Sequence, residues 1–253
     1  MSIQHVNDDD ESVSEQHTDK QVAKFPFPLY TYLLLACIAA VYLVQLFTTQ
    51  DPEFIAMDRF AAYFAGFDKQ AFLNQHQYWR ILTGATVHSG VLHVLMNSYA
   101  LYSFGRLIEL LSNRAHLAIV FILSALGGGV LSLVFNPEVT SVGASGGIVG
   151  LLSYLAVYAF RRRQFIAAEF RRSLLINIGF ILVFGLVLFN TIDNFGHVGG
   201  LIVGAIYAFI QIPGDEYVDP RSAGTFVKFL GVASIVIYIL TSLFTIWLLI
   251  NAG

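Results

Sequence analysis

Residues 116–135, HLAIVFILSALGGGVLSLVF, decide the fold, because they run the length of a membrane span without an acidic residue, a lysine or an arginine. An α-helix needs about 20 mostly apolar residues to cross the hydrocarbon core of a bilayer. Further apolar stretches lie at 28–48, 91–111, 173–191 and 226–250, and shorter ones at 145–160 and 196–212. Strands of a membrane barrel alternate in polarity over about ten residues, and these stretches do not. The sequence therefore predicts an all-α polytopic membrane protein with seven spanning helices.

The composition of the whole chain agrees with lipid as its main solvent. Of the 253 residues, 56% are hydrophobic and 12% are charged, which is not the balance of a water-soluble globule. A net charge of -3 and the lack of a basic stripe argue against nucleic acid as a partner. We expect membrane lipids and membrane proteins as partners, and the sequence leaves the oligomeric state open.

Basic residues predict the orientation in the membrane. The loop 161–172 carries five arginines, whereas the loops 136–144 and 190–195 carry no basic residue. Short loops rich in arginine and lysine stay in the cytoplasm. Counting helices from 161–172 then places the amino terminus in the cytoplasm and the carboxyl terminus outside a cell membrane.

Three regions follow from this pattern. Residues 1–27 are predicted to form a polar, disordered cytoplasmic tail, 28–212 a six-helix core, and 213–253 a linker with the seventh helix. Within the core, about 49–90 forms a first outer loop that mixes aromatic and charged residues. Such a mixture suits the membrane interface, so we expect short helices lying in the outer leaflet there.

Polar side chains gather at the outer ends of three predicted helices. They are His88, His93 and Asn97 on the second helix, Ser145 on the fourth and His197 on the sixth. Ionisable and polar groups inside lipid are costly and are functional candidates by default. Ser145 and His197 precede the cytoplasmic ends of their helices by the same number of residues, which places both about 8 Å below the outer surface. A hydroxyl and an imidazole at equal depth suggest a nucleophile and its general base.

Glycines explain how these two helices approach each other. Gly146 and Gly150 are four residues apart on the fourth helix, and Gly200 and Gly204 are four apart on the sixth. Small residues at this spacing let helix backbones pack closely in membranes. Close approach is what a Ser–His hydrogen bond requires.

His93 and Asn97 are also four residues apart, so they share a helix face. With the backbone N–H of Ser145 they form a candidate oxyanion hole, since donors of this kind stabilise the negative charge that develops in acyl transfer.

Four motifs together resemble those of the rhomboid proteases, in the same order and on corresponding helices. They are Trp79-Arg80, His93-Val94-Leu95-Met96-Asn97, Gly143-Ala144-Ser145-Gly146, and His197-Val198-Gly199-Gly200 followed by Gly204. The resemblance covers about 75–210 and the first helix, and the extra last helix resembles the six-plus-one arrangement of part of the family. Two positions depart from the family's pattern: Val149 stands where an aromatic residue is usual, and Gly196 where alanine is frequent.

The resemblance implies an intramembrane serine protease that hydrolyses peptide bonds in or near transmembrane segments. Ser145 would be the nucleophile and His197 the base, with His93, Asn97 and the Ser145 amide as oxyanion hole. Trp79 and Arg80 would help to shape the first outer loop. The expected substrates are transmembrane proteins whose helix is weak near the outer face, and no cofactor is required.

Other assignments of the same residues remain open. Ser141 is a rival nucleophile, and Asp193 is either a third member of a triad or the cap of the sixth helix. The histidines at 88, 93 and 197 are a possible zinc set, although the sequence has no His-Glu-x-x-His motif. His88 and His116 are otherwise expected to be structural or interfacial.

Two other functional classes also compete with the protease. A catalytically silent relative that binds or escorts transmembrane helices predicts loss of the serine or the histidine, and both are present. A small transporter predicts inverted repeats with broken helices at the midplane, whereas the polar residues here lie toward one face.

Overall fold

The computed structural model describes residues 27–49, 59–188, 192–215 and 217–252. The predicted tail 1–27, apart from Phe27, and residues 50–58 of the first outer loop lie outside these ranges. The helices are α1 (Leu29–Thr48), α2 (Arg59–Ala65), α3 (Lys69–Asn74), α4 (Arg80–Thr83), α5 (Val91–Leu111), α6 (Arg114–Phe135), α7 (Ser145–Arg161), α8 (Ala168–Val187), α9 (Asn194–Gln211) and α10 (Thr225–Asn251).

The long helices have the character of membrane spans. Within the described ranges, α1, α6, α8, α9 and α10 are each long and apolar enough to cross a bilayer, and α7 is a shorter apolar helix. Helix α5 also has the length of a span, but it is less apolar overall than these five helices. The chain is therefore an all-α polytopic membrane protein, as the sequence predicts.

One predicted boundary is wrong. The stretch expected at 173–191 forms a helix over Ala168–Val187, so it begins five residues early and takes in two arginines assigned to the loop. Glu169 lies in its first turn, where a negative charge complements the helix dipole. Arg171 donates to the carbonyl oxygens of Arg163 (3.0 Å) and Ile166 (2.5 Å), which fixes the start of the helix against the preceding turn.

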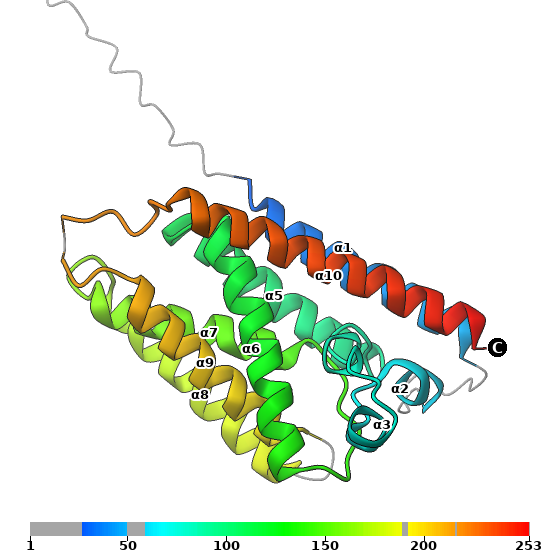
Figure 1. Ribbon diagram of the computed structural model, residues 1–253. Coiled ribbons are helices and arrows are strands. Elements are labelled where there is room, and N and C mark those ends of the chain that lie inside the picture. Colours follow the sequence, from blue (N-terminus) through cyan, green and yellow to red (C-terminus); the bar gives the residue numbers. More distant parts are fainter. Residues whose placement is uncertain (1–26, 50–58, 189–191, 216, 253) are drawn as a thin grey trace, which may run out of the picture.

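Helix α7 forms the centre of the bundle, and most of its residues from Gly147 to Ala159 are buried. It packs against α6 and α9, while α1 and α10 lie side by side along one edge (Figure 1). Helix α8 covers the opposite side and has only Leu174 and Gly185 buried. The site residues on α7 and α9 are thus held by the best-packed part of the molecule.

Glycines set the spacing between α7 and α9. A Cβ atom added to Gly200 would lie 2.1 Å from the carbonyl oxygen of Gly146, and one added to Gly204 would lie 2.2 Å from that of Gly150. No side chain fits at such separations, so the two backbones touch directly along these positions.

The first outer loop contains the short helices α2, α3 and α4, as expected. Arg80 is buried among them and donates to the carbonyl oxygens of Tyr63 (3.1 Å) and Gly66 (2.9 Å). Phe67 forms an antiparallel bridge with Ser141, in which each amide donates to the other's carbonyl at 2.9 and 3.1 Å. The loop is therefore attached to the segment that leads into α7.

Helix α10 supports the last part of this loop. The hydroxyl of Tyr238 donates to the carbonyl oxygen of Ala85 at 3.1 Å, and Thr86 Oγ1 lies 3.0 Å from Thr245 Oγ1. Trp79 packs edge-to-face on Phe244, with ring centroids 6.0 Å apart. The last helix thus contacts the segment that precedes α5.

Candidate active site

Ser145 is the first residue of α7, at the end of a backbone turn that requires glycine. Gly143 has a φ of 114°, in the region that residues with a side chain rarely adopt. Its amide donates to the carbonyl oxygen of Gly84 at 2.8 Å, which joins this turn to the first outer loop. No side chain caps the start of α7, and the first amides of a helix have no partner within it. The Ser145 amide is therefore available as a donor beside its own hydroxyl.

His197 lies in the first turn of α9 and meets Ser145 from across the bundle. Its Nε2 is 2.8 Å from Ser145 Oγ, although the two residues are 52 positions apart in the sequence. When the serine hydroxyl donates to Nε2, the imidazole carries its hydrogen on Nδ1. Among the described residues that Nδ1 is buried and has no hydrogen-bond partner. The pair consequently has the geometry of a nucleophile and general base without a third member.

His93 and Asn97 converge on the turn before Ser145. A Cβ atom on Gly143 would lie 2.7 Å from His93 Nε2 and 3.4 Å from Asn97 Nδ2. The backbone amide of Ser89 donates to His93 Nδ1 at 3.4 Å, which makes Nδ1 an acceptor and leaves the hydrogen on Nε2. Asn97 Nδ2 is buried and has no hydrogen-bond partner in the described part of the chain. Two N–H donors thus lie against the backbone next to the serine.

Asp193 is the N-cap of α9, which confirms the capping alternative. Its Oδ1 accepts from the amide of Gly196 at 2.9 Å. Its Oδ2 accepts from Ser132 Oγ at 2.6 Å and from Ser141 Oγ at 2.5 Å. The carboxylate has no hydrogen bond with His197 in the described structure, so it is not the third member of a triad in the usual sense.

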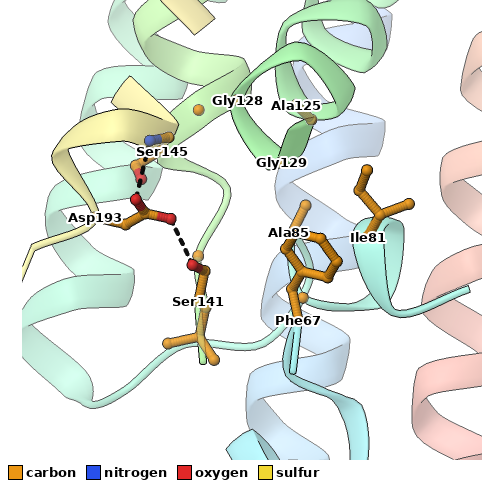
Figure 2. Close-up of a pocket in the computed structure, with 14 residues that line it drawn as sticks. Phe67, Ile81, Ala85, Ala125, Gly128, Gly129, Ser141, Ser145 and Asp193 are labelled. Carbon is orange, nitrogen blue, oxygen red and sulfur yellow. Dashed lines mark hydrogen bonds between the residues drawn. The ribbon is translucent and has the colours of Figure 1, made fainter. Parts of the chain in front are cut away.

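A small cavity of about 50 Å³ opens beside Ser145. Figure 2 shows Asp193 and Ser141 on one side of it, and Phe67, Ile81 and Ala85 of the first outer loop on the other. The helical wall is built from small residues of α6, including Ala125, Gly128 and Gly129. Ser145 therefore borders a space between α6, α9 and the first outer loop.

His88 lies at the margin of this site, whereas His116 does not. His88 is buried and packs edge-to-face on His93, with ring centroids 5.1 Å apart. His116 is elsewhere, with its Nδ1 2.8 Å from the hydroxyl of Tyr207. No group of three metal-ligating side chains occurs in the described ranges. Val149 is buried one turn after the serine.

Lys69 was not singled out by its sequence. It begins α3, is 1% exposed, and donates through Nζ to the carbonyl oxygen of Val139 and to Ser141 Oγ. Burial lowers the pKa of Lys69 to about 8, against the opposing attraction of Asp193 and Asp68. A single lysine in a loop of mixed polarity carries no pattern that reveals such a position.

These features define a class of protein: a helical membrane protein whose bundle holds a serine and a histidine in hydrogen-bond contact at the ends of two tightly packed helices. The Rhomboid domain model matches residues 75–214, which is more than half of the chain and includes every predicted site residue. The chain belongs to the rhomboid family.

Similar proteins come from bacteria, plants and animals. Rhomboid protease GluP of Bacillus subtilis (strain 168) is 30% identical over 193 residues, which are 75% of this chain and 36% of that protein. RHOMBOID-like protein 2 of Arabidopsis thaliana is 31% identical over 147 residues, 57% of this chain and 46% of the relative. Inactive rhomboid protein 1 of Bos taurus is 33% identical over 139 residues, 54% of this chain and 16% of the relative. The chain thus spans less than half the length of each of these relatives.

Proposed function

We propose that this protein is an intramembrane serine protease that hydrolyses peptide bonds in or near transmembrane segments through Ser145 and His197. The observation that carries the proposal is the 2.8 Å separation between Ser145 Oγ and His197 Nε2. A hydroxyl becomes an effective nucleophile when an adjacent base accepts its proton, and this contact provides that base.

The proposed reaction begins when His197 Nε2 takes the proton from Ser145 Oγ, which attacks the carbonyl carbon of the scissile peptide bond. The oxyanion that forms accepts hydrogen bonds from the Ser145 amide, Asn97 Nδ2 and His93 Nε2–H. His197 then gives its proton to the leaving amine, and an acyl-enzyme remains on Ser145. Water, deprotonated by His197, hydrolyses that ester and regenerates the serine.

The oxyanion donors support this function independently of the dyad. Asn97 Nδ2 is a buried N–H group without a partner in the described structure, and such a group is costly unless a ligand or water satisfies it. An oxyanion that forms next to Ser145 satisfies this donor. The hydrogen bond is then made during the reaction and not in the resting protein, which is how differential stabilisation of a transition state arises.

We further propose that the site lies toward the outer face of the cell membrane, with the amino terminus in the cytoplasm. The arginines of the 161–172 segment support this orientation. This segment runs from the last residue of α7, at the end away from Ser145, into the first turns of α8. Substrates are membrane proteins whose spanning helix unwinds near its outer end, because a peptide carbonyl engaged in a helix is not open to attack. Membrane lipids are the other partners.

A silent function, in which the protein binds or escorts transmembrane helices, is the second candidate. The similarity to a protein named as an inactive rhomboid favours it. The paired Ser145 and His197 favour the protease, since a protein that only binds helices does not require either group.

Cleavage of single-pass substrates in liposomes distinguishes the two functions. Wild type is expected to cut substrates that have small, helix-weakening residues near the outer end of the span. Ser145→Ala and His197→Ala are expected to lower kcat on the order of 10⁴-fold or more, and a chelator is expected to have no effect.

Ser173→Ala provides a matched control, because Ser173 is an exposed serine on α8 whose hydroxyl donates to the Phe170 carbonyl oxygen. The control should cut like wild type. Equal inactivity of wild type and both dyad variants on a panel of substrates would support the silent function, and loss of cleavage with chelator alone would contradict a serine mechanism.

A further inference from the structure

A second hydrogen bond joins the same two segments of the chain as the Ser145–His197 contact. Ser141 Oγ and Asp193 Oδ2 are 2.5 Å apart, and these residues lie four positions before Ser145 and His197, respectively. Both pairs are therefore separated by the same 52 positions. The chain around the start of α7 and the chain around the start of α9 are thus joined twice, once by the proposed catalytic pair and once, four residues earlier, by this pair.

Asp193 also fixes the first turn of α9 through its other atoms. Its Oδ1 accepts from the Gly196 amide at 2.9 Å, and its carbonyl oxygen accepts from the His197 amide at 3.1 Å. A third contact, from Ser132 Oγ at 2.6 Å, attaches the carboxylate to the end of α6. The backbone that carries the proposed base thus takes its position from one aspartate.

Lys69 connects the same pair to the first outer loop. Its Nζ donates to Ser141 Oγ and to the carbonyl oxygen of Val139, and it lies 5.2 Å from the centre of the Phe67 ring. The Ser141 hydroxyl accepts from the ammonium and donates to the Asp193 carboxylate, so it joins the two charges without a direct ion pair. A lysine that is 1% exposed needs such partners, because an unpaired buried charge is strongly destabilising.

We infer that Asp193 and Lys69, joined through Ser141, are positioning residues that hold the dyad in register with the first outer loop. The inference rests on the proposed protease function and adds the means by which α3 and the serine turn are attached to the start of α9. Neither residue touches the reacting atoms. Both act by restricting where Ser145 Oγ and His197 Nε2 lie, and a displacement of about 1 Å in such a pair costs up to about 100-fold in rate.

The test combines kinetics with hydrogen exchange in the full chain, reconstituted in liposomes for the kinetics and in detergent for the exchange. Asp193→Ala and Ser141→Ala are expected to lower kcat about 10- to 100-fold with KM changed less than about twofold. The amides of Gly196 and His197 are expected to exchange at least about tenfold faster in Asp193→Ala. The Gly196 amide loses its acceptor, the Asp193 carboxylate. The His197 amide keeps its acceptor, the carbonyl oxygen of residue 193, but the side chain that holds that residue in place is gone.

A charge-removal cycle separates positioning from a general loss of stability. Asp193→Asn keeps an oxygen that can cap α9 but leaves Lys69 without its carboxylate, and Lys69→Met leaves the carboxylate without its ammonium. The double variant Lys69→Met/Asp193→Asn buries neither charge. The kcat of the double variant, relative to wild type, is expected to be at least about five times the product of the relative kcat values of the two single variants. Non-additivity of this kind is typical of groups in one network.

Glu138→Gln and Lys228→Met are the controls, because both residues are exposed and, in the described structure, neither side chain bonds to Lys69, Ser141 or Asp193. The Glu138 carboxylate accepts from Gln70 at 3.3 Å, and glutamine keeps an oxygen that can accept this bond. Both controls should retain wild-type kcat and exchange. The positioning role is overturned if kcat is unchanged in Asp193→Ala and Ser141→Ala. It is also overturned if the relative kcat of the double variant equals the product of the relative kcat values of the single variants. Either result leaves the proposed function intact, provided that wild type cleaves its substrate. If wild type cleaves nothing, the proposed function falls and the positioning role falls with it, whatever the exchange shows.

Discussion

The carbonyl oxygen of Gly146 lies so close to Gly200 that a Cβ atom on Gly200 would be 2.1 Å away. This contact, one residue after Ser145 and three after His197, fixes how near the two helices come. It makes the distance between the proposed nucleophile and base depend on the absence of a single methyl group.

Gly200→Ala is therefore expected to force α9 away from α7 and to abolish cleavage, with a loss of at least about 100-fold in kcat. Gly179→Ala on α8 is the matched control, because a Cβ atom there meets nothing within 4 Å. Cleavage rates and thermal unfolding in detergent measure both. Wild-type activity in Gly200→Ala would show that the bundle can repack around the methyl group, contrary to the geometry.

Asn97 supplies a donor that is unpaired in the described structure, so its removal should affect the transition state more than substrate binding. We expect Asn97→Ala to lower kcat about 10²- to 10³-fold with little change in KM, as for the loss of one oxyanion-hole donor. Steady-state kinetics on a liposome-reconstituted substrate give both constants. A rise in KM at constant kcat would instead assign Asn97 to substrate binding.

Helix α10 should stabilise the segment that leads to α5. Tyr238→Phe removes the donor to the Ala85 carbonyl oxygen and leaves that buried group unsatisfied, so we expect a loss of about 1–3 kcal/mol in the free energy of unfolding. Tyr99→Phe is the control, because Tyr99 is 75% exposed. Denaturation of the two variants in mixed micelles, side by side with wild type, checks the difference. Equal free energies of unfolding for Tyr238→Phe and wild type would mean that this bond from α10 does not stabilise the fold.

The pKa of Lys69 gives stability a specific dependence on pH. Burial lowers this pKa from its ordinary value of 10.5 to about 8 in the folded protein. Between these values the unfolded chain holds a proton that the folded chain has released, so the folded state should become more stable as pH rises from about 8 toward 10.5.

Lys69→Met should lack this increment, whereas Lys228→Met, which removes an exposed lysine, should keep it. Unfolding free energies measured across the interval give the comparison. Parallel curves for wild type and Lys69→Met would show that Lys69 titrates normally in the folded protein.

The sequence by itself determined the membrane-spanning class and most helix positions, because a span is a local property of about 20 apolar residues. It also indicated the candidate residues, since Ser145, His197, His93 and Asn97 stand out as polar groups at the ends of apolar helices. The glycine spacing predicted which faces of α7 and α9 would meet. One boundary failed at α8, where arginines that signal a loop lie instead within the first turns of the helix.

The tertiary structure alone decided how these residues are oriented and connected. The 2.8 Å contact between Ser145 and His197, the choice of capping over triad for Asp193, and the link from Lys69 through Ser141 all join segments far apart in the chain. The local sequence pattern does not predict such pairings, because they depend on how several helices pack together. Lys69 shows this most clearly, since only the fold turns an ordinary loop lysine into a buried partner of the helix that bears His197.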